Sequence, residues 1–284
     1  DDGLVGRVFQ QRRNRDRDAL GARLRLRIDA HRLPDCKAGA RSGRVVSSSD
    51  QSRSIEEIHT ESENIRTAWR WAVETENWTI LAKSMSALMI YKEIVGHYAD
   101  GREMFQMALD KLLSSAAPQL EWLDSNLRVR LGWMVFCTGE HAAGLLHLQA
   151  GLESFSKSGS TLEVAISLYL LAKANERLNR PQIAIEQATK SLEVFRDPRY
   201  ADLRLARSLL AHTLEVYGLG LIRLEQVRES KAVLQESLHI HQQLGQRYGS
   251  VHVLDALGKV AVAEGDLSGA LSLRLQALKI ARDF

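Results

Sequence analysis

The chain has 284 residues, of which 45% are hydrophobic and 26% charged, and only four are prolines. These values are ordinary for a folded globular protein, and the length suffices for a large core or for a repeat array. No run of about 18 apolar residues occurs, so no membrane helix is expected. The two cysteines, Cys36 and Cys137, are far apart, which fits a reducing, cytoplasmic setting better than a disulfide scaffold.

Charge is distributed unevenly along the chain. Residues 1–44 carry eleven Arg and one Lys against six Asp, whereas the remaining residues sum to −3. A nucleic-acid-binding domain needs a basic face on its folded part, so this class is not favoured. Nucleic-acid contact through the arginines of residues 1–44 stays as a lesser alternative, and it would weaken steeply with salt. Because the first residue is Asp1, we interpret the sequence as a fragment or a processed chain.

Residues 1–53 differ from the rest of the sequence. Their main apolar positions are Leu20, Leu24, Leu26 and Ile28. Leu20, Leu24 and Ile28 could line one face of a helix. Leu24, Leu26 and Ile28 alternate with arginine, as in a strand, and both interpretations stay open. Residues 42–54 are rich in Ser and Gly, as in a linker. We expect 1–53 to be a basic segment that is poorly ordered or a remnant of another domain, and 54–284 to form one helical domain.

The first predicted helix begins at Ser54, which forms a capping box with Glu57. Apolar residues then follow at helical spacing. They are Ile55, Ile58, Ile65, Ala68, Trp69, Ala72 and Val73. The pattern predicts a helix that runs to about Glu76, with Asn77 marking its end.

From Trp78 onward a unit repeats. Aligned turns fall at Gly96, Gly139, Asn179, Glu225 and Gly265, with spacings of 43, 40, 46 and 40 residues. Small residues recur at three registers around each turn: fourteen of the fifteen residues there are Gly, Ala or Ser, and the exception is Met89. The residues seven positions before the turn are Met89, Gly132, Ala172, Gly218 and Gly258. The residues five positions after it are Gly101, Gly144, Ala184, Ser230 and Ala270. The residues twelve positions after it are Ala108, Gly151, Ser191, Ser237 and Ala277. A leucine follows each of the last set: Leu109, Leu152, Leu192, Leu238 and Leu278.

Small residues at these spacings predict helical hairpins. Two antiparallel helices approach closely only where small side chains face each other, and leucines fill the gaps beside them. One hairpin cannot bury its own apolar faces, so several must stack. The predicted fold is therefore all-α: about five hairpins preceded by one helix. An irregular helical bundle is the alternative. Further caps are expected at Ser160 with Glu163, and at Ser250 before Val251.

The repeat resembles tetratricopeptide-repeat (TPR) proteins. The residues that carry this resemblance are Gly96-His97-Tyr98, Gly101, Phe105 and Ala108-Leu109, with Leu131-Gly132 and Leu257-Gly258 in first helices. TPR units have about 34 residues, so the likeness is to a long-helix variant. It covers residues 78–284 and implies a right-handed α-solenoid.

A narrower resemblance precedes the repeats. Residues 61–72, ESENIRTAWRWA, are similar to the helix that opens the TPR region of bacterial STAND-class ATPases, such as MalT-like and LuxR-type regulators. This resemblance implies a sensor arm that follows an ATPase and a winged helix, neither of which is recognisable in this sequence.

Motifs for catalysis, metals and cofactors are not recognisable. There is no P-loop, nucleophile elbow, His-Glu-x-x-His or paired Cys-x-x-Cys, so we predict neither an enzyme nor a cofactor or metal site. His239 and His241 are two apart, which places them on different sides of a helix. Cys137 is interpreted as a buried small hydrophobe.

The tryptophans could form a carbohydrate-stacking site or pack in the core. They are Trp69, Trp71, Trp78, Trp122 and Trp133. We favour the core for Trp69, whereas Trp133 follows the small Gly132 and could point to the inner face.

The TPR resemblance implies that first helices line a concave groove. The matching positions are Asn126, Trp133, Tyr169, Lys173, Glu176, Arg177, His212, Glu215, Arg223, His252, Asp255 and Lys259. This mixed set suits a partner protein, a peptide or a small polar ligand. For any one member, a solvated helix face is the alternative, as for the i,i+4 pair Asp255 and Lys259.

We therefore expect a non-catalytic binding or sensor module, the arm of a larger bacterial signal-transducing regulator. The alternative is a small-molecule inducer site in a transcriptional activator.

Overall fold

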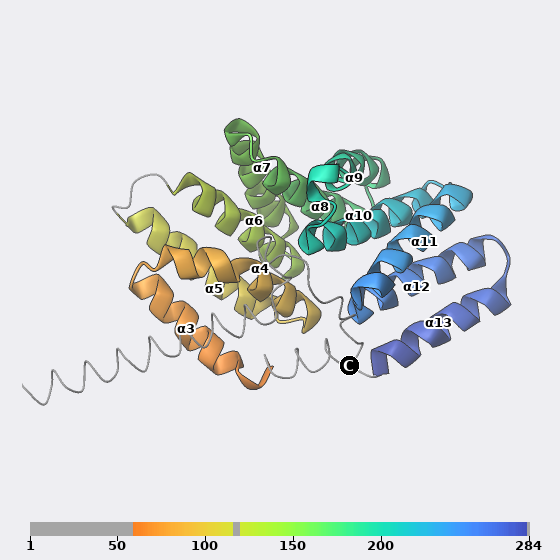
Figure 1. Cartoon of the computed structure of the whole chain (residues 1–284), viewed down its shortest axis with the longest axis horizontal. Coiled ribbons are helices and arrows are strands. Elements are labelled where there is room, and N and C mark those ends of the chain that lie inside the picture. Colours follow the sequence, from red (N-terminus) through yellow and green to blue (C-terminus); the bar gives the residue numbers. More distant parts are fainter. Residues whose placement is uncertain (1–58, 116–119, 283–284) are drawn as a thin grey trace, which may run out of the picture.

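The computed structural model describes residues 59–115 and 120–282. In these residues the chain forms an all-α solenoid without strands (Figure 1). The helices, labelled as in Figure 1, are α3 (Ser62–Glu74), α4 (Trp78–Ile94), α5 (Tyr98–Ser114), α6 (Glu121–Cys137), α7 (His141–Ser158), α8 (Thr161–Arg177), α9 (Pro181–Phe195), α10 (Arg204–Arg223), α11 (Val227–Leu244), α12 (Arg247–Ala263) and α13 (Leu267–Arg282). A short 3-10 helix spans Pro198–Tyr200.

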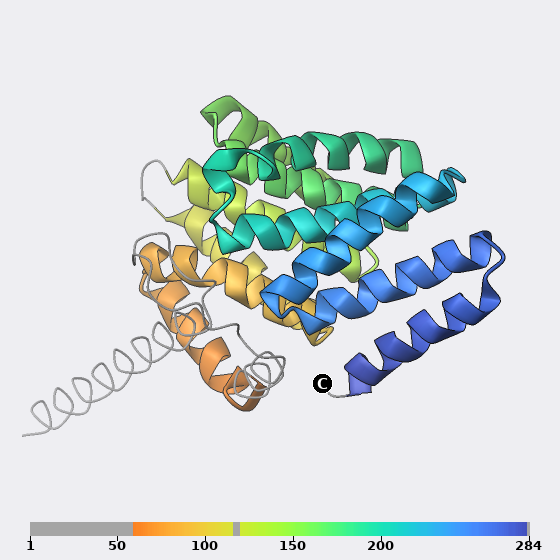
Figure 2. The same cartoon turned by 45° about the vertical axis from the view of Figure 1, so that its right-hand side comes forward.

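These helices form α3 followed by five stacked hairpins, α4–α5 to α12–α13, which confirms the predicted architecture. Figures 1 and 2 show the hairpins in an arch with α3 and α13 at its ends. The described residues contain no helix with the length and apolar character needed to cross a membrane. The predicted segment 1–53 and the Ser54–Glu57 capping box lie outside the described residues.

The aligned turn residues share one backbone conformation. Gly96, Gly139, Asn179, Glu225 and Gly265 have φ values of 72°, 98°, 58°, 61° and 80°. Glycine adopts this left-handed region freely and asparagine tolerates it, whereas glutamate is strained there. The repeat register inferred from the sequence is thus the register of the hairpin turns.

The small residues of the three registers are buried as predicted, except for the half-buried Met89. Gly132 of α6 and Gly144 of α7 face each other so closely that a Cβ on Gly144 would lie 2.7 Å from the Gly132 carbonyl oxygen. In the first hairpin Met89 takes the position of Gly132, and α4 and α5 approach each other much less closely. The one hairpin with a large side chain at this register is thus the one whose helices are farther apart, and α3 packs against both of them.

Helix α3 ends at Glu74, close to the predicted end at about Glu76, and Asn77 also caps α4, accepting from the Ile80 amide at 3.3 Å. Two predicted caps were wrong. Ser160 is the N-cap residue of α8, but its hydroxyl pairs with Ser158 at 2.9 Å and makes no cap bond. Ser250 lies within α12, not before it, and donates to the Gln246 carbonyl.

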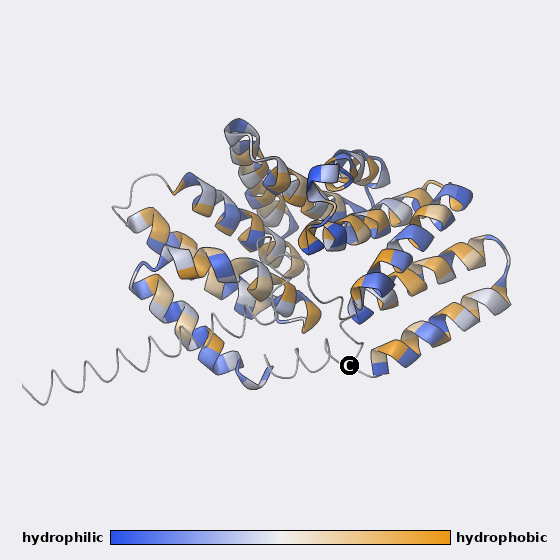
Figure 3. Ribbon diagram, viewed as in Figure 1, coloured by the Kyte–Doolittle hydropathy of each residue, from blue (hydrophilic) through white to orange (hydrophobic). Residues whose placement is uncertain are grey.

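The leucines of the last helix are more exposed than expected. Leu278, which we expected to fill a gap beside the small residues, is 46% exposed, and Leu271 and Leu275 of the same helix are 61% and 54% exposed. Figure 3 shows hydrophobic positions interspersed with hydrophilic ones along α13. Within the described residues no helix packs on the outer side of α13, so only Ala270 and Ala277, which face α12, are buried.

Candidate functional site

The first helices of the hairpins share a polar inner face. Lys173 of α8 pairs with Glu93 at the end of α4, although α6 lies between these helices in the stack. A contact that skips one hairpin arises on the inner side of a curved array. The side chains here come from α4, α6, α8, α10 and α12, with one from α11.

Part of this face is a cation cluster, which we define as Glu93, Trp133, Lys173 and Arg177. The Lys173 ammonium and the Arg177 guanidinium both lie 4.8 Å from the centre of the Trp133 ring. Trp133 is buried and stacks on Phe136. Its ring is therefore a platform under two cations, a favourable cation–π arrangement.

The Glu93–Lys173 ion pair is largely buried, with 13% and 18% of the two side chains exposed. Desolvation alone would raise the pKa of Glu93, but the Lys173 ammonium outweighs it, so this pKa lies below its ordinary value. Desolvation would likewise lower the pKa of Lys173, but Glu93 holds it well above the ordinary value. Both groups are thus charged at neutral pH. Burial raises the pKa of the neighbouring Tyr169 to about 12, so its hydroxyl is neutral.

Arg177 is the exposed member of the cation cluster. Its guanidinium donates to the Cys137 sulfur at 3.2 Å, and the nearby Glu93 is held by Lys173. Cys137 is half-buried at the end of α6 and packs against the hydrophobic core, so its assignment as a buried hydrophobe is confirmed only in part. Burial raises the pKa of this thiol.

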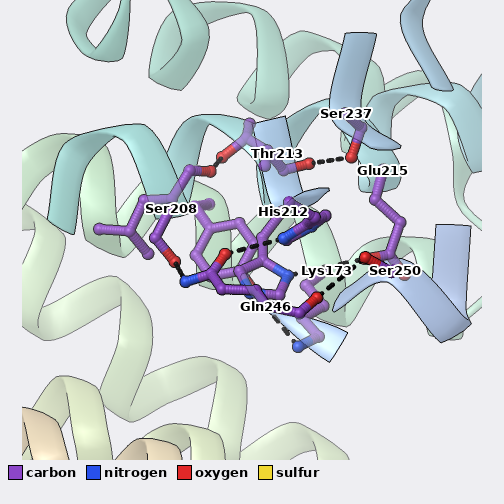
Figure 4. A network of polar contacts seen from close by, with 12 residues as sticks. Lys173, Ser208, His212, Thr213, Glu215, Ser237, Gln246 and Ser250 are labelled. Carbon is purple, nitrogen blue, oxygen red and sulfur yellow. Dashed lines mark hydrogen bonds and ion pairs between the residues drawn. The ribbon is translucent and has the colours of Figure 1, made fainter. Parts of the chain in front are cut away.

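Next to the cation cluster lies a histidine cluster, which we define as His212, Glu215 and His241. Figure 4 labels His212 and Glu215 together with Lys173. The Nδ1 atom of His212 is 3.7 Å from a Glu215 carboxylate oxygen, and the rings of His212 and His241 are 4.6 Å apart. The ring of Tyr169 lies 6.4 Å from that of His212 and connects the two clusters.

The charges of the histidine cluster are set by burial and by its neighbours. Desolvation would raise the pKa of Glu215, but the adjacent His212 and the charges of His252 and Lys173 lower it to about 2. Desolvation lowers the pKa of His241 to about 3, so its ring is neutral. The cluster therefore carries a carboxylate and a neutral imidazole at pH 7.

Seven of the twelve predicted groove residues lie together in or beside these clusters. They are Trp133, Tyr169, Lys173, Arg177, His212, Glu215 and His252. The structure leaves the other five apart. Asn126 is buried and bonds to Trp122 and Arg130.

The remaining four residues form ion pairs. Arg223 bonds to Glu176 at 2.9 Å and to Asn179 at 3.0 Å, next to a hairpin turn. Asp255 and Lys259 pair at 2.9 Å along α12, as in the helix-face alternative.

Two important residues were missed. Glu93 precedes a turn and has no periodic signature, because its partner is 80 residues away. His241 was considered only with the exposed His239. In the structure α12 packs directly against this ring, since a Cβ on Gly249 would lie 2.7 Å from Nε2 of His241.

Comparisons with known proteins support the fold. No family model matches the sequence, and no curated protein matches it significantly. Among solved structures, the chain is similar to the crystal structure of BtubC (BKLC) from P. vanneervenii, with a TM-score of 0.55 and 18% identity over 84% of this chain and 90% of that chain. This likeness, at low identity, shows a helical-repeat fold.

Proposed function

We propose that this chain is a non-catalytic protein-interaction module whose inner face binds an acidic segment of a partner protein. The helical-repeat fold supports the general class, because stacked hairpins present an extended surface. The observation that carries the specific proposal is Arg177, an exposed guanidinium held against the Trp133 ring. A cation that is already positioned loses little side-chain freedom when it binds a carboxylate.

The net charge of the cation cluster favours an anion. Lys173 and Arg177 contribute two positive charges and Glu93 one negative charge. Because Lys173 neutralises Glu93, the charge of Arg177 is available to a carboxylate, with which it can form two parallel hydrogen bonds.

The experiment compares a labelled peptide rich in glutamate with the same peptide carrying glutamine, using fluorescence anisotropy. We expect the glutamate peptide to bind more tightly, and Arg177→Glu to weaken it about tenfold or more. Arg228→Glu makes the same charge change at an exposed position of α11 and serves as the control. Equal binding of both peptides, or an equal loss in both variants, would contradict the proposal.

Two other cations among the predicted groove residues, Lys173 and Lys259, are less suitable for charge reversal than Arg177. Lys173→Glu would place two carboxylates in a largely buried pair and would unfold the site, and Lys259 pairs within its own helix. Neither is a clean probe of binding, so Arg177 carries the test.

We further propose that the module is the arm of a bacterial signal-transducing regulator. Support comes from the resemblance of residues 61–72 to the helix that opens the TPR region in that class. A small polar inducer is the alternative occupant, favoured by the buried charges of the inner face. Thermal melts with sugars, nucleotides and peptides separate the two, because a ligand that binds the folded state raises the melting temperature.

A further inference from the structure

Two imidazoles and one carboxylate meet in the histidine cluster. His212 and Glu215 lie about one turn apart in α10, and His241 comes from α11. One ligand atom from each lies within 4.8 Å of the other two. Around a single Zn²⁺ at about 2.0–2.2 Å, tetrahedral ligand atoms are roughly 3.4 Å apart. Side-chain shifts of about 1 Å would close the present arrangement on an ion.

One atom of the cluster lacks a partner. His241 is completely buried, and its Nε2 makes no hydrogen bond within the described part of the chain. Buried polar atoms are nearly always satisfied, so such an atom calls for an explanation. The backbone of α12 at Gly249 encloses the ring on one side, and His212 lies on another.

The hydrogen bonds around His241 determine which nitrogen is available. Its Nδ1 lies 2.8 Å from the side-chain oxygen of Gln246, an atom that can only accept. The Gln246 amide in turn donates to the Ser208 hydroxyl at 2.7 Å, which orients it. Nδ1 therefore carries the proton and Nε2 presents a lone pair. Histidine ligands of metals typically donate their second ring N–H to such an oxygen, which fixes tautomer and orientation.

We propose that His212, Glu215 and His241 form a binding site for a transition-metal ion, with Zn²⁺ as the best match to two imidazoles and one carboxylate. Three protein ligands leave a fourth position for water or for a donor atom of a bound molecule. The nearby Lys173 does not oppose the ion strongly, because Glu93 compensates its charge. This inference is independent of the acidic partner segment proposed above.

The test uses the full chain, freed of metal with a chelator and titrated with Zn²⁺ against a chromophoric competitor. We expect one tight equivalent per chain. Co²⁺ should give the intense visible absorption of a tetrahedral site. Glu215→Gln and His212→Gln should each weaken Zn²⁺ binding at least about 100-fold, because each removes a ligand. Gln246→Ala removes only the support of His241 and should weaken binding about 10- to 100-fold.

The matched control is His239→Gln, which removes an exposed histidine two residues from His241 and should leave binding unchanged. Loss of binding in that variant, or Zn²⁺ binding that His212→Gln and Glu215→Gln do not change, would overturn the assignment. His241→Gln alters a core position, so it is not needed for the decision. If the ligand variants unfold, the Co²⁺ spectrum of the unmodified chain decides: an octahedral, weakly absorbing spectrum rejects the site.

Discussion

The first hairpin and the second hairpin are held together by different forces. In α6–α7 the helices touch backbone to backbone at Gly132 and Gly144. In α4–α5 the helices approach each other much less closely, and α4 is held by buried apolar side chains such as Leu81 and Met85 together with ion pairs. Its Lys92 pairs with Asp100, and its Glu93 reaches α8. Close packing gives a rigid unit, whereas charged contacts make the position of α4 responsive to solution conditions. The inner face contains residues of both hairpins, such as Glu93 of α4 and Trp133 of α6.

The largest expected effect lies in the tightly packed hairpin. A Cβ on Gly144 would lie 2.7 Å from the Gly132 carbonyl oxygen and from the Phe136 amide nitrogen. Backbone cannot move aside, so Gly144→Ala should lower the free energy of unfolding by about 3 kcal/mol. Chemical denaturation monitored by circular dichroism measures this.

The matched control for Gly144→Ala is Gly101→Ala, at the same register of the first hairpin. There a new Cβ would meet the flexible side chain of Met134, with its sulfur at 2.8 Å. This side chain can shift, so we expect a loss of about 1 kcal/mol or less. Equal losses in both variants would show that the hairpins pack alike.

The second prediction breaks the polar attachment of α4. Glu93→Gln leaves the Lys173 ammonium in a largely buried site without its partner. A fully buried pair would lose about 3–5 kcal/mol, and the partial exposure here reduces the expected loss to about 2 kcal/mol. Hydrogen exchange should increase in α4 before it increases in α6 and α7. The exposed pair Glu153–Lys157 provides the control, because Glu153→Gln should leave the free energy of unfolding almost unchanged.

The third prediction concerns pH. The pKa of Glu93 is lower in the folded protein than its ordinary value of 4.5. Its stabilising contribution is therefore complete above pH 4.5 and is lost as the pH falls through the folded value. Protection of α4 amides should decrease in that acid range. Glu93→Gln should make α4 protection much less dependent on pH there. An unchanged pH profile would mean that other carboxylates control α4.

Sequence patterns predicted what depends on local spacing. The turn register followed from Gly96, Gly139 and Gly265, because close helix packing and a left-handed turn both restrict the residues that fit. Met89 is the only large residue among the fifteen positions of the three registers, and it lies in the hairpin whose helices are farthest apart.

The candidate site was only partly predictable, because its partners are distant in sequence. Lys173 was placed on the inner face, but nothing near it indicates Glu93, which lies 80 residues before it. Asn126 lies two turns before Trp133 on the same face of α6, yet it is buried. It accepts a hydrogen bond from Arg130 of α6, which also donates to Ser86 of α4. Periodicity shows which face of a helix a residue occupies, and the curvature of the array decides which faces meet.

The smallest expected effect tests whether glycine at the contact register is always required. Gly258 of α12 is equivalent to Gly132 of α6, but a Cβ there would meet only the Arg274 side chain, 3.3 Å away, and the Ala270 carbonyl oxygen at 3.6 Å. Arg274 is half exposed and can move. Alanine is also favoured over glycine within a helix by up to about 1 kcal/mol. Gly258→Ala should therefore be neutral or raise the free energy of unfolding by up to about 0.5 kcal/mol, whereas Gly132→Ala should lower it by about 2–3 kcal/mol. Opposite signs in these two melts would show that the last hairpin tolerates a side chain that the second hairpin excludes.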